Sequence, residues 1–257
     1  MALRNGNGSS SASGASVEPP MEHDHSPSAI RERLTGNTHA NYLRDWVYGG
    51  IDGAVTTFAI VAGVAGAELS SRVVIILGIA NLFADGLSMA ASNYSGTKAE
   101  VDDVARLTEI ERRHIRLDSD GEREEIRQIL ALKGLEGEVL EGAVRAITSH
   151  EGRWIEMMLT EEYGVAGAQR KPLISAASTF AAFLLAGAVP LLPYMLGFDS
   201  ALPWALVMVM LVFVTIGSLK SLWSLQSWWR SGFETLSIGL AAAGVAYAIG
   251  YLLKGLT

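Results

Sequence analysis

The sequence predicts an all-α integral membrane protein with five transmembrane helices and a cytoplasmic three-helix insert between the second and third of them. Five long apolar stretches carry the first part of this prediction, and each is close to the roughly 20 residues that a helix needs to cross a bilayer. They cover residues 46–67, 73–95, 173–196, 201–219 and 235–253. An uneven charge distribution carries the second part, because residues 98–171 hold 17 of the 27 acidic and 12 of the 20 basic residues.

The overall composition agrees with a membrane protein and excludes several other classes. Hydrophobic residues make up 49% of the 257, charged residues only 18%, and the mean hydropathy is +0.27. The net charge of −7 means that the chain has no overall basic footprint for nucleic acid. Cysteine is absent, which excludes disulfides, zinc–thiolate sites and iron–sulfur ligation within the chain.

Four segments follow along the chain. Residues 1–40 form a tail that is poor in large apolar groups, so we expect it to be disordered, and it lacks the apolar run of a signal peptide. Residues 41–97 hold transmembrane helices 1 and 2, residues 98–171 an acidic helical metal-binding domain, and residues 172–257 transmembrane helices 3 to 5.

Basic residues near the helix ends predict the orientation in the membrane. The Lys and Arg residues flanking one side outnumber those of the other, and they are Arg31, Arg33, Arg44, Lys98, Arg170, Lys171, Lys220 and Arg230. Because such residues favour the cytoplasmic side, we expect the N-terminus and the insert to be cytoplasmic.

The insert has the spacing of about three helices. Residues 98–117 can continue the second transmembrane helix, followed by helices near 121–133 and 136–163, the last with a possible break near Glu151 and Gly152. Asp118 and Asp120 are candidate N-caps.

Asp52 and Asp85 are the formal charges within the five apolar stretches. A carboxylate at membrane depth is costly and indicates an ion or proton path. On an α-helix, Asp85 shares one polar face with Asn81, Ser88, Met89 and Ser92. The alternative is that these polar groups only join helices by hydrogen bonds. Carboxylate, amide and thioether ligands together suit a borderline divalent metal.

The insert repeats these ligand types at helical spacing. The candidate metal ligands are Glu111 with His114, Glu122 with Glu125, and the group Met157, Met158 and Glu161. The alternative is a solvated acidic surface. Glu111 and His114 are also half of a di-iron carboxylate pattern, but the insert contains no second Glu-x-x-His pair.

Several segments resemble the vacuolar iron transporter family, especially its bacterial branch. They are GGIDGAVTTFAIVAGVAGA, GIANLFADGLSMAASNY, WIEMMLTEEYG, LLAGAVPLLPY and SGFETLSIG, and the resemblance covers about residues 40–254. It implies a dimer of five-helix protomers that exchanges cytoplasmic ferrous iron, and often manganese, for protons. It also implies a location in the inner (plasma) membrane of a bacterium, or in the vacuolar membrane of a eukaryote.

The resemblance also implies site residues and two departures. Asp52 and Met89 match the membrane site, and the insert positions matched are Glu111, Glu122, Glu125, Met157, Met158 and Glu161. Asn81 stands where plant members carry a Glu, so Asp85 is the candidate proton carrier beside Asp52. His114 also replaces a Glu, which can broaden selectivity towards Zn²⁺, Co²⁺ or Ni²⁺.

The sequence therefore predicts a proton-coupled exporter of Fe²⁺, with Mn²⁺, Zn²⁺, Co²⁺ and Ni²⁺ as further candidate ions. No tightly bound cofactor, enzymatic activity or nucleic-acid partner is expected, and the partners are lipid, metal ions, protons and a second copy of the chain. Two alternatives to a transporter stay open. One is a membrane-anchored iron oxidation or storage protein, and the other is a metal sensor without transport.

Overall fold

The computed structural model describes residues 24–35, 40–165, 170–221 and 227–256, and the chain divides into two units, residues 1–38 and 39–257. Among residues 24–35, the described part of the first unit, there is one helix, α1 (Pro27–Thr35), and none of its residues is buried. This helix lies within the tail that we expected to be disordered. The rest of that expectation concerns residues 1–23 and 36–39, which lie outside the described residues.

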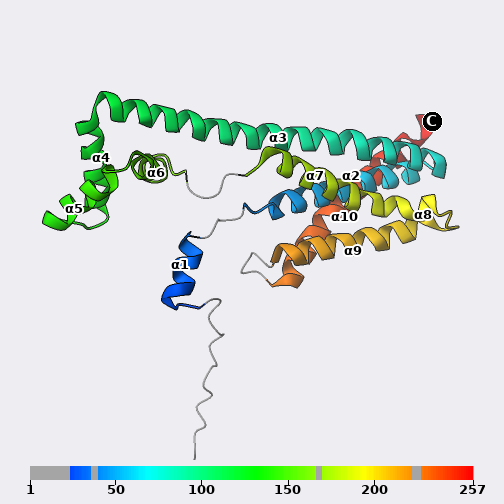
Figure 1. Cartoon of the computed structure of the whole chain (residues 1–257). Coiled ribbons are helices and arrows are strands. Elements are labelled where there is room, and N and C mark those ends of the chain that lie inside the picture. Colours follow the sequence, from blue (N-terminus) through cyan, green and yellow to red (C-terminus); the bar gives the residue numbers. More distant parts are fainter. Residues whose placement is uncertain (1–23, 36–39, 166–169, 222–226, 257) are drawn as a thin grey trace, which may run out of the picture. The chain divides into compact units, whose positions relative to one another are not determined.

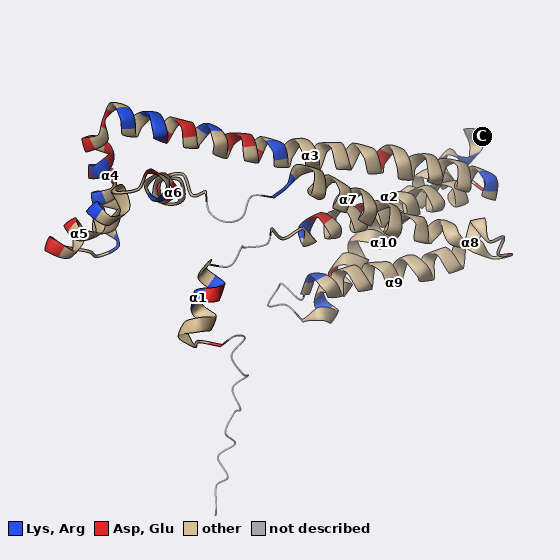
Figure 2. Cartoon of the chain, in the orientation of Figure 1, with Lys and Arg blue, Asp and Glu red and all other residues tan. Residues whose placement is uncertain are grey.

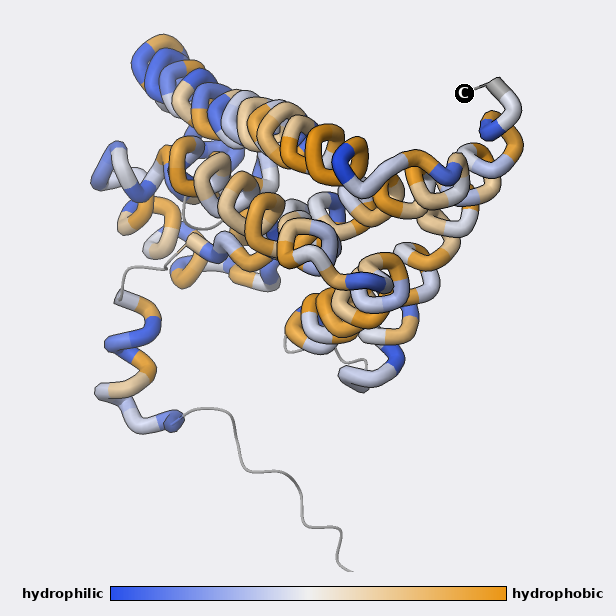
Figure 3. The backbone as a smooth tube through the Cα atoms, turned by 90° about the vertical axis from the view of Figure 1, so that its right-hand side faces the viewer, coloured by the Kyte–Doolittle hydropathy of each residue, from blue (hydrophilic) through white to orange (hydrophobic). Residues whose placement is uncertain are grey.

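The second unit contains five helical segments that are long and apolar enough to cross a membrane (Figures 1 and 3). Within its described residues these are α2 (Leu43–Gly66), α3 (Ser71–Leu117), α7 (Pro172–Ala188) extended by η1 (Val189–Leu191) and α8 (Leu192–Met195), α9 (Ala201–Ser221) and α10 (Trp228–Leu253), after which η2 (Lys254–Leu256) follows. The predicted all-α fold with five spans is confirmed. The cytoplasmic placement of the insert stays a prediction.

Two of the spans begin three or more residues before their predicted starts. The first span begins at Leu43, so that Asp45, which the sequence pattern left outside it, lies in the first turn of α2. The fifth begins at Trp228, seven residues before the predicted start. Hydropathy locates the apolar middle of a helix, whereas the backbone hydrogen bonds continue into polar residues at its ends.

Helix α3 joins the membrane bundle to the insert without a break. Its 47 residues correspond to about 70 Å at 1.5 Å per residue, more than twice the hydrocarbon thickness of a bilayer. Charged residues occupy its distal half and helices α4 (Ser119–Leu132), α5 (Gly137–Thr148) and α6 (Glu151–Glu161), as Figure 2 shows. One continuous helix thus runs from the bundle into the insert.

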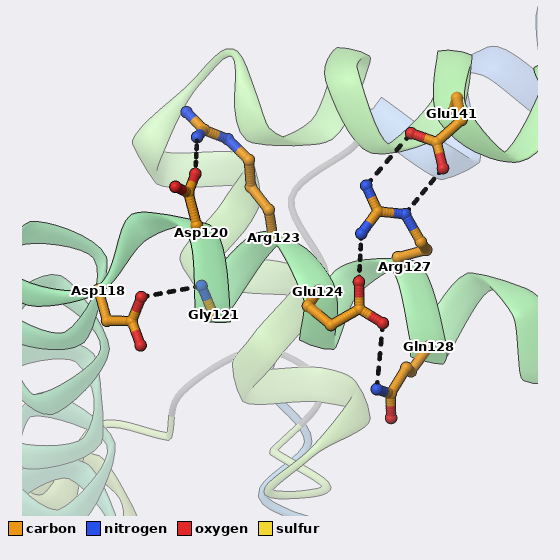
Figure 4. A network of polar contacts seen from close by, with 8 residues as sticks. All are labelled: Asp118, Asp120, Gly121, Arg123, Glu124, Arg127, Gln128 and Glu141. Carbon is orange, nitrogen blue, oxygen red and sulfur yellow. Dashed lines mark hydrogen bonds and ion pairs between the residues drawn. The ribbon is translucent and has the colours of Figure 1, made fainter.

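The insert folds around a small apolar core and a capped turn. Asp118 is the N-cap of α4, as predicted, and its side chain accepts a hydrogen bond of 3.0 Å from the Gly121 amide (Figure 4). Arg127 joins α4 to α5 through Glu141, at 2.7 Å. The buried core consists of Ile126, Leu130, Val144, Trp154 and Met158.

Helix α2 is the most enclosed of the five spans, with half of its apolar window buried. Two glycines one turn apart make this possible. A Cβ at Gly49 would lie 2.3 Å from the Thr179 carbonyl oxygen, and one at Gly53 would lie 2.3 Å from that of Phe183. The close contact between the backbones of α2 and α7 fixes the helix that carries Asp45 and Asp52.

Candidate metal sites in the membrane helices and the insert

Asp52 and Asp85 lie on neighbouring helices, α2 and α3, where each is half-buried. Their carboxylates are close enough to repel each other electrostatically. Thr56 connects the two helices at this level, because its Oγ1 accepts a hydrogen bond of 3.4 Å from Asn81 Nδ2 and donates one of 2.8 Å to the Asp52 carbonyl. The structure therefore brings together three of the predicted membrane-site residues, Asp52, Asn81 and Asp85.

Met89 lies one turn further along α3 and borders a hollow of about 290 Å³. The hollow is lined by Tyr48, Ser88, Met89, Ser92, Asn93 and Thr179. Ser88 and Ser92 are exposed, whereas Met89 is half-buried and packs against the core of the bundle. The polar face predicted from the helical spacing thus continues from Asn81 to the hollow.

Glu111, His114 and Glu122 form a compact cluster in the insert. One ligand atom of each lies within 4.8 Å of the others. His114 Nδ1 is 3.9 Å from Glu111 Oε1 and 3.4 Å from Glu122 Oε1. The helix spacing brings Glu111 and His114 to one face of α3, and the turn at Asp118 folds α4 back so that Glu122 meets them.

Both carboxylates of this cluster are unusually buried. Glu111 is 1% and Glu122 is 6% exposed. Tyr163 donates a hydrogen bond of 2.8 Å to Glu111 Oε1. Among the described residues, the second oxygens, Glu111 Oε2 and Glu122 Oε2, have no hydrogen-bond partner. Buried oxygens without donors are costly, and a cation is one group that offsets this cost.

The electrostatics of the cluster follow from burial and like charge. Burial, followed by the charges of Glu125, Glu111 and Glu162, raises the pKa of Glu122 to about 7. Burial together with Glu111 and Glu125 also raises the pKa of Glu162. A divalent cation among these carboxylates would stabilise their ionised forms and reverse both shifts.

The structure distributes the other predicted insert ligands over three environments. Glu125 is within electrostatic reach of the cluster, and Glu161 forms an ion pair of 2.7 Å with Lys133. Met158 is fully buried in the insert core, against which Met157 packs. Glu162, which was not among the predicted ligands, interacts with Glu111 and Glu125 instead. Glu162 lies beside Glu161 in the sequence, but helical spacing alone does not predict which of the two side chains faces the cluster.

The ligand set of the insert suits a borderline divalent metal. Carboxylate oxygens bind hard cations and imidazole nitrogen binds first-row transition metals. The described residues offer two buried carboxylates and one imidazole within a few ångströms, with two further carboxylates close by.

The fold and these sites define a membrane protein with several spans. The polar face of one long helix links an acidic domain, which carries candidate metal-ligating side chains, to the two neighbouring carboxylates of the membrane helices. The chain belongs to the VIT family, whose model matches residues 43–251.

Named relatives agree with this membership. The chain is 32% identical over 216 residues to vacuolar iron transporter 1 of Arabidopsis thaliana, covering 82% of this chain and 86% of that one. It is 31% identical over 215 residues to vacuolar iron transporter 2 of Oryza sativa subsp. japonica, covering 82% and 87%. A vacuolar iron transporter of Toxoplasma gondii is 30% identical over 249 residues, covering 90% and 82%. The relatives are named as transporters and not as enzymes.

Proposed function

We propose that this protein transports ferrous iron out of the cytoplasm in exchange for protons. The names of its relatives support iron as the cargo. The observation that carries the proposal is the Asp52–Asp85 pair, because two neighbouring carboxylates among membrane-spanning helices are costly unless an ion or proton passes there.

In this proposal, the insert captures the metal and the membrane pair passes it on. Glu111, His114 and Glu122 bind Fe²⁺ on the cytoplasmic side, with Glu125 and Glu162 adding negative charge. The ion then moves along the polar face of α3 to Met89 and Asp52. A carboxylate that releases its proton when metal arrives and regains it when metal leaves performs the exchange. Asp52 and Asp85 are the two groups that we assign to it.

The same proposal includes a homodimer that meets along α3. Only 22% of the apolar window of this helix is buried. Its exposed face combines small residues, Ala84, Ser88, Ala91 and Ser95, with Phe83 and Leu87, which are 54% and 57% exposed. Small residues allow close contact between membrane helices. A second copy would shield the polar face from lipid.

Iron uptake into proteoliposomes with an imposed pH gradient tests the function. We expect vesicles containing the protein to accumulate Fe²⁺ faster than protein-free vesicles, and faster with a gradient than without one. Fe²⁺ accumulation at the same rate with and without the pH gradient would contradict proton coupling. Metal binding without accumulation would instead favour an iron oxidation, storage or sensing protein.

A further inference from the structure

A further buried carboxylate, that of Asp45, lies beside the Met89 hollow on the side of the insert. Asp45, in the first turn of α2, is only 2% exposed and forms an ion pair with Arg170, which precedes α7. Asn93 Nδ2, on α3, donates a hydrogen bond of 3.0 Å to the same oxygen, Asp45 Oδ1. Both donors therefore reach one oxygen of the carboxylate.

The other oxygen, Asp45 Oδ2, is buried, and no described residue donates a hydrogen bond to it. Asp45 borders a hollow of about 170 Å³ that also touches Glu100, Ser92, Asn93 and Arg170. An ionised oxygen without a donor at the wall of a polar hollow is expensive. It is suited to a small cation that enters the hollow.

The position of this hollow fits a route along α3. It shares Tyr48, Ser92 and Asn93 with the hollow that touches Met89. Glu100 lies 11 residues beyond Met89 and 11 before Glu111, which is about 16 Å in each direction along the helix. Glu100 thus lies midway along α3 between Met89 and the candidate site at Glu111, and Asp45, which is hydrogen-bonded to Asn93, lies about one turn beyond Met89 on the insert side.

We propose that Asp45 is an additional divalent-metal site through which the cation passes between the insert and Met89, and that Arg170 keeps this site closed until metal replaces its guanidinium. The inference rests on the transport proposed above. Asp45 and Glu100 supply carboxylate oxygens and Ser92 a hydroxyl, which are the hard donors that Fe²⁺ and Mn²⁺ accept. Arg170 retains a partner when metal displaces it, because its Nη2 also donates a hydrogen bond of 3.0 Å to Ser175 Oγ.

The effect of substituting Asp45 or Arg170 on metal binding distinguishes a gated metal site from an ion pair with a purely structural role. If the pair only holds α2 against the start of α7, loss of either partner has the same effect. If Asp45 binds metal and Arg170 competes with it, Arg170→Gln strengthens metal binding and Asp45→Asn weakens it.

The binding test counts Mn²⁺ bound to the full-length protein by the electron paramagnetic resonance of the free ion. Arg170→Gln is compared with the double variant Asp45→Asn/Arg170→Gln, in which both charges are absent and side-chain size is kept. We expect the single variant to bind one more Mn²⁺ than the double variant, or to bind Mn²⁺ roughly tenfold more tightly. Equal binding by the two variants would overturn the inference.

The transport test measures Fe²⁺ uptake into vesicles, with thermal unfolding as a check on folding. Asp45→Asn should raise the KM for Fe²⁺, and Arg170→Gln should lower it. The double variant should fold, and its KM for Fe²⁺ should be as high as that of Asp45→Asn. Wild-type uptake by the double variant would show that Asp45 only balances Arg170. Asp102→Asn, which breaks an exposed ion pair of 2.8 Å with Lys98 on α3, is the matched control and should transport normally. If the wild-type protein itself takes up no Fe²⁺, the proposed function fails, while the Mn²⁺ measurement still decides whether Asp45 binds metal.

Discussion

His114 Nδ1, on α3, lies 3.4 Å from Glu122 Oε1, on α4. These side chains are eight residues apart in sequence, and the turn capped by Asp118 brings them together. Glu111, one turn before His114, completes a group of two carboxylates and one imidazole. In the function proposed here, this mixture of oxygen and nitrogen ligands sets the metal preference of the insert.

His114→Glu should therefore change the selectivity of the insert. Imidazole favours Co²⁺, Ni²⁺ and Zn²⁺ more than Mn²⁺, so the variant should lose affinity for Ni²⁺ relative to Mn²⁺, by about tenfold in the ratio of dissociation constants. Titration calorimetry on the full-length protein measures both. His150→Ala is the control, since this insert histidine lies outside the cluster and contacts Ser149. An unchanged ratio in His114→Glu would remove His114 from the ligand set.

Glu122 should make the stability of the metal-free insert depend on pH. Its pKa of about 7 in the folded protein lies above its ordinary value of 4.5. The contribution to stability is therefore fully present below pH 4.5 and is lost as the pH rises through 7. Hydrogen exchange of α4 amides should be slower at pH 5 than at pH 8, after correction for the intrinsic rate.

Glu122→Gln separates this effect from the other carboxylates. The neutral amide should make α4 more protected than in the wild type at pH 8 without metal, by on the order of 2 kcal/mol, while weakening metal binding. Wild-type metal binding should in turn weaken below pH 7, as Glu122 takes up a proton. Equal protection of wild type and variant at both pH values would contradict the raised pKa.

Met89→Ala should slow the uptake of Fe²⁺ more than the uptake of Mn²⁺. The thioether is a softer ligand than an oxygen, so its loss removes part of the preference for Fe²⁺ while leaving the carboxylates for Mn²⁺. Competition between the two ions during vesicle uptake measures the change. Met210→Ala, on α9, is the matched control, and the same shift in both variants would show that Met89 is not a ligand.

The absence of cysteine allows a direct test of the dimer. A single Ser88→Cys substitution on the exposed face of α3 should give disulfide-linked dimers in the membrane after mild oxidation, because a two-fold contact places equal residues opposite each other. Ala84→Cys and Ala91→Cys extend the scan along the same face. Val207→Cys, at an exposed position of α9, is the control. Equal cross-linking of the α3 and α9 variants would mean that the disulfides form by random collision of protein molecules in the membrane, and it would contradict a dimer along α3.

Much of the fold was predictable because it depends on local patterns. Apolar length located the five spans, and helical spacing predicted a helix over residues 98–117 that could continue the second span, as α3 does to Leu117. The cluster was predictable in part for the same reason, since Glu111 and His114 share a helix face.

Contacts between distant residues were not predictable in this way. Asp45 and Arg170 are 125 residues apart, and Asp45 seemed to precede the first span because hydropathy rises only after it. Glu161 and Glu162 differ by about 100° of helix rotation. Only the packing of α6 assigns Glu161 to Lys133 and Glu162 to the acidic cluster.

The most direct test of the account counts iron and protons in the same vesicles, with an iron-sensitive dye and a pH-sensitive dye. We predict that Fe²⁺ uptake by the wild-type protein drives protons in the opposite direction and that Asp52→Ala stops both movements. Asp85→Asn, which keeps size and hydrogen bonding but cannot titrate, should reduce proton movement more than iron uptake. Iron uptake by folded Asp52→Ala protein at the wild-type rate would contradict the membrane site, and a wild-type ratio of protons to iron in Asp85→Asn would leave Asp52 as the sole carrier.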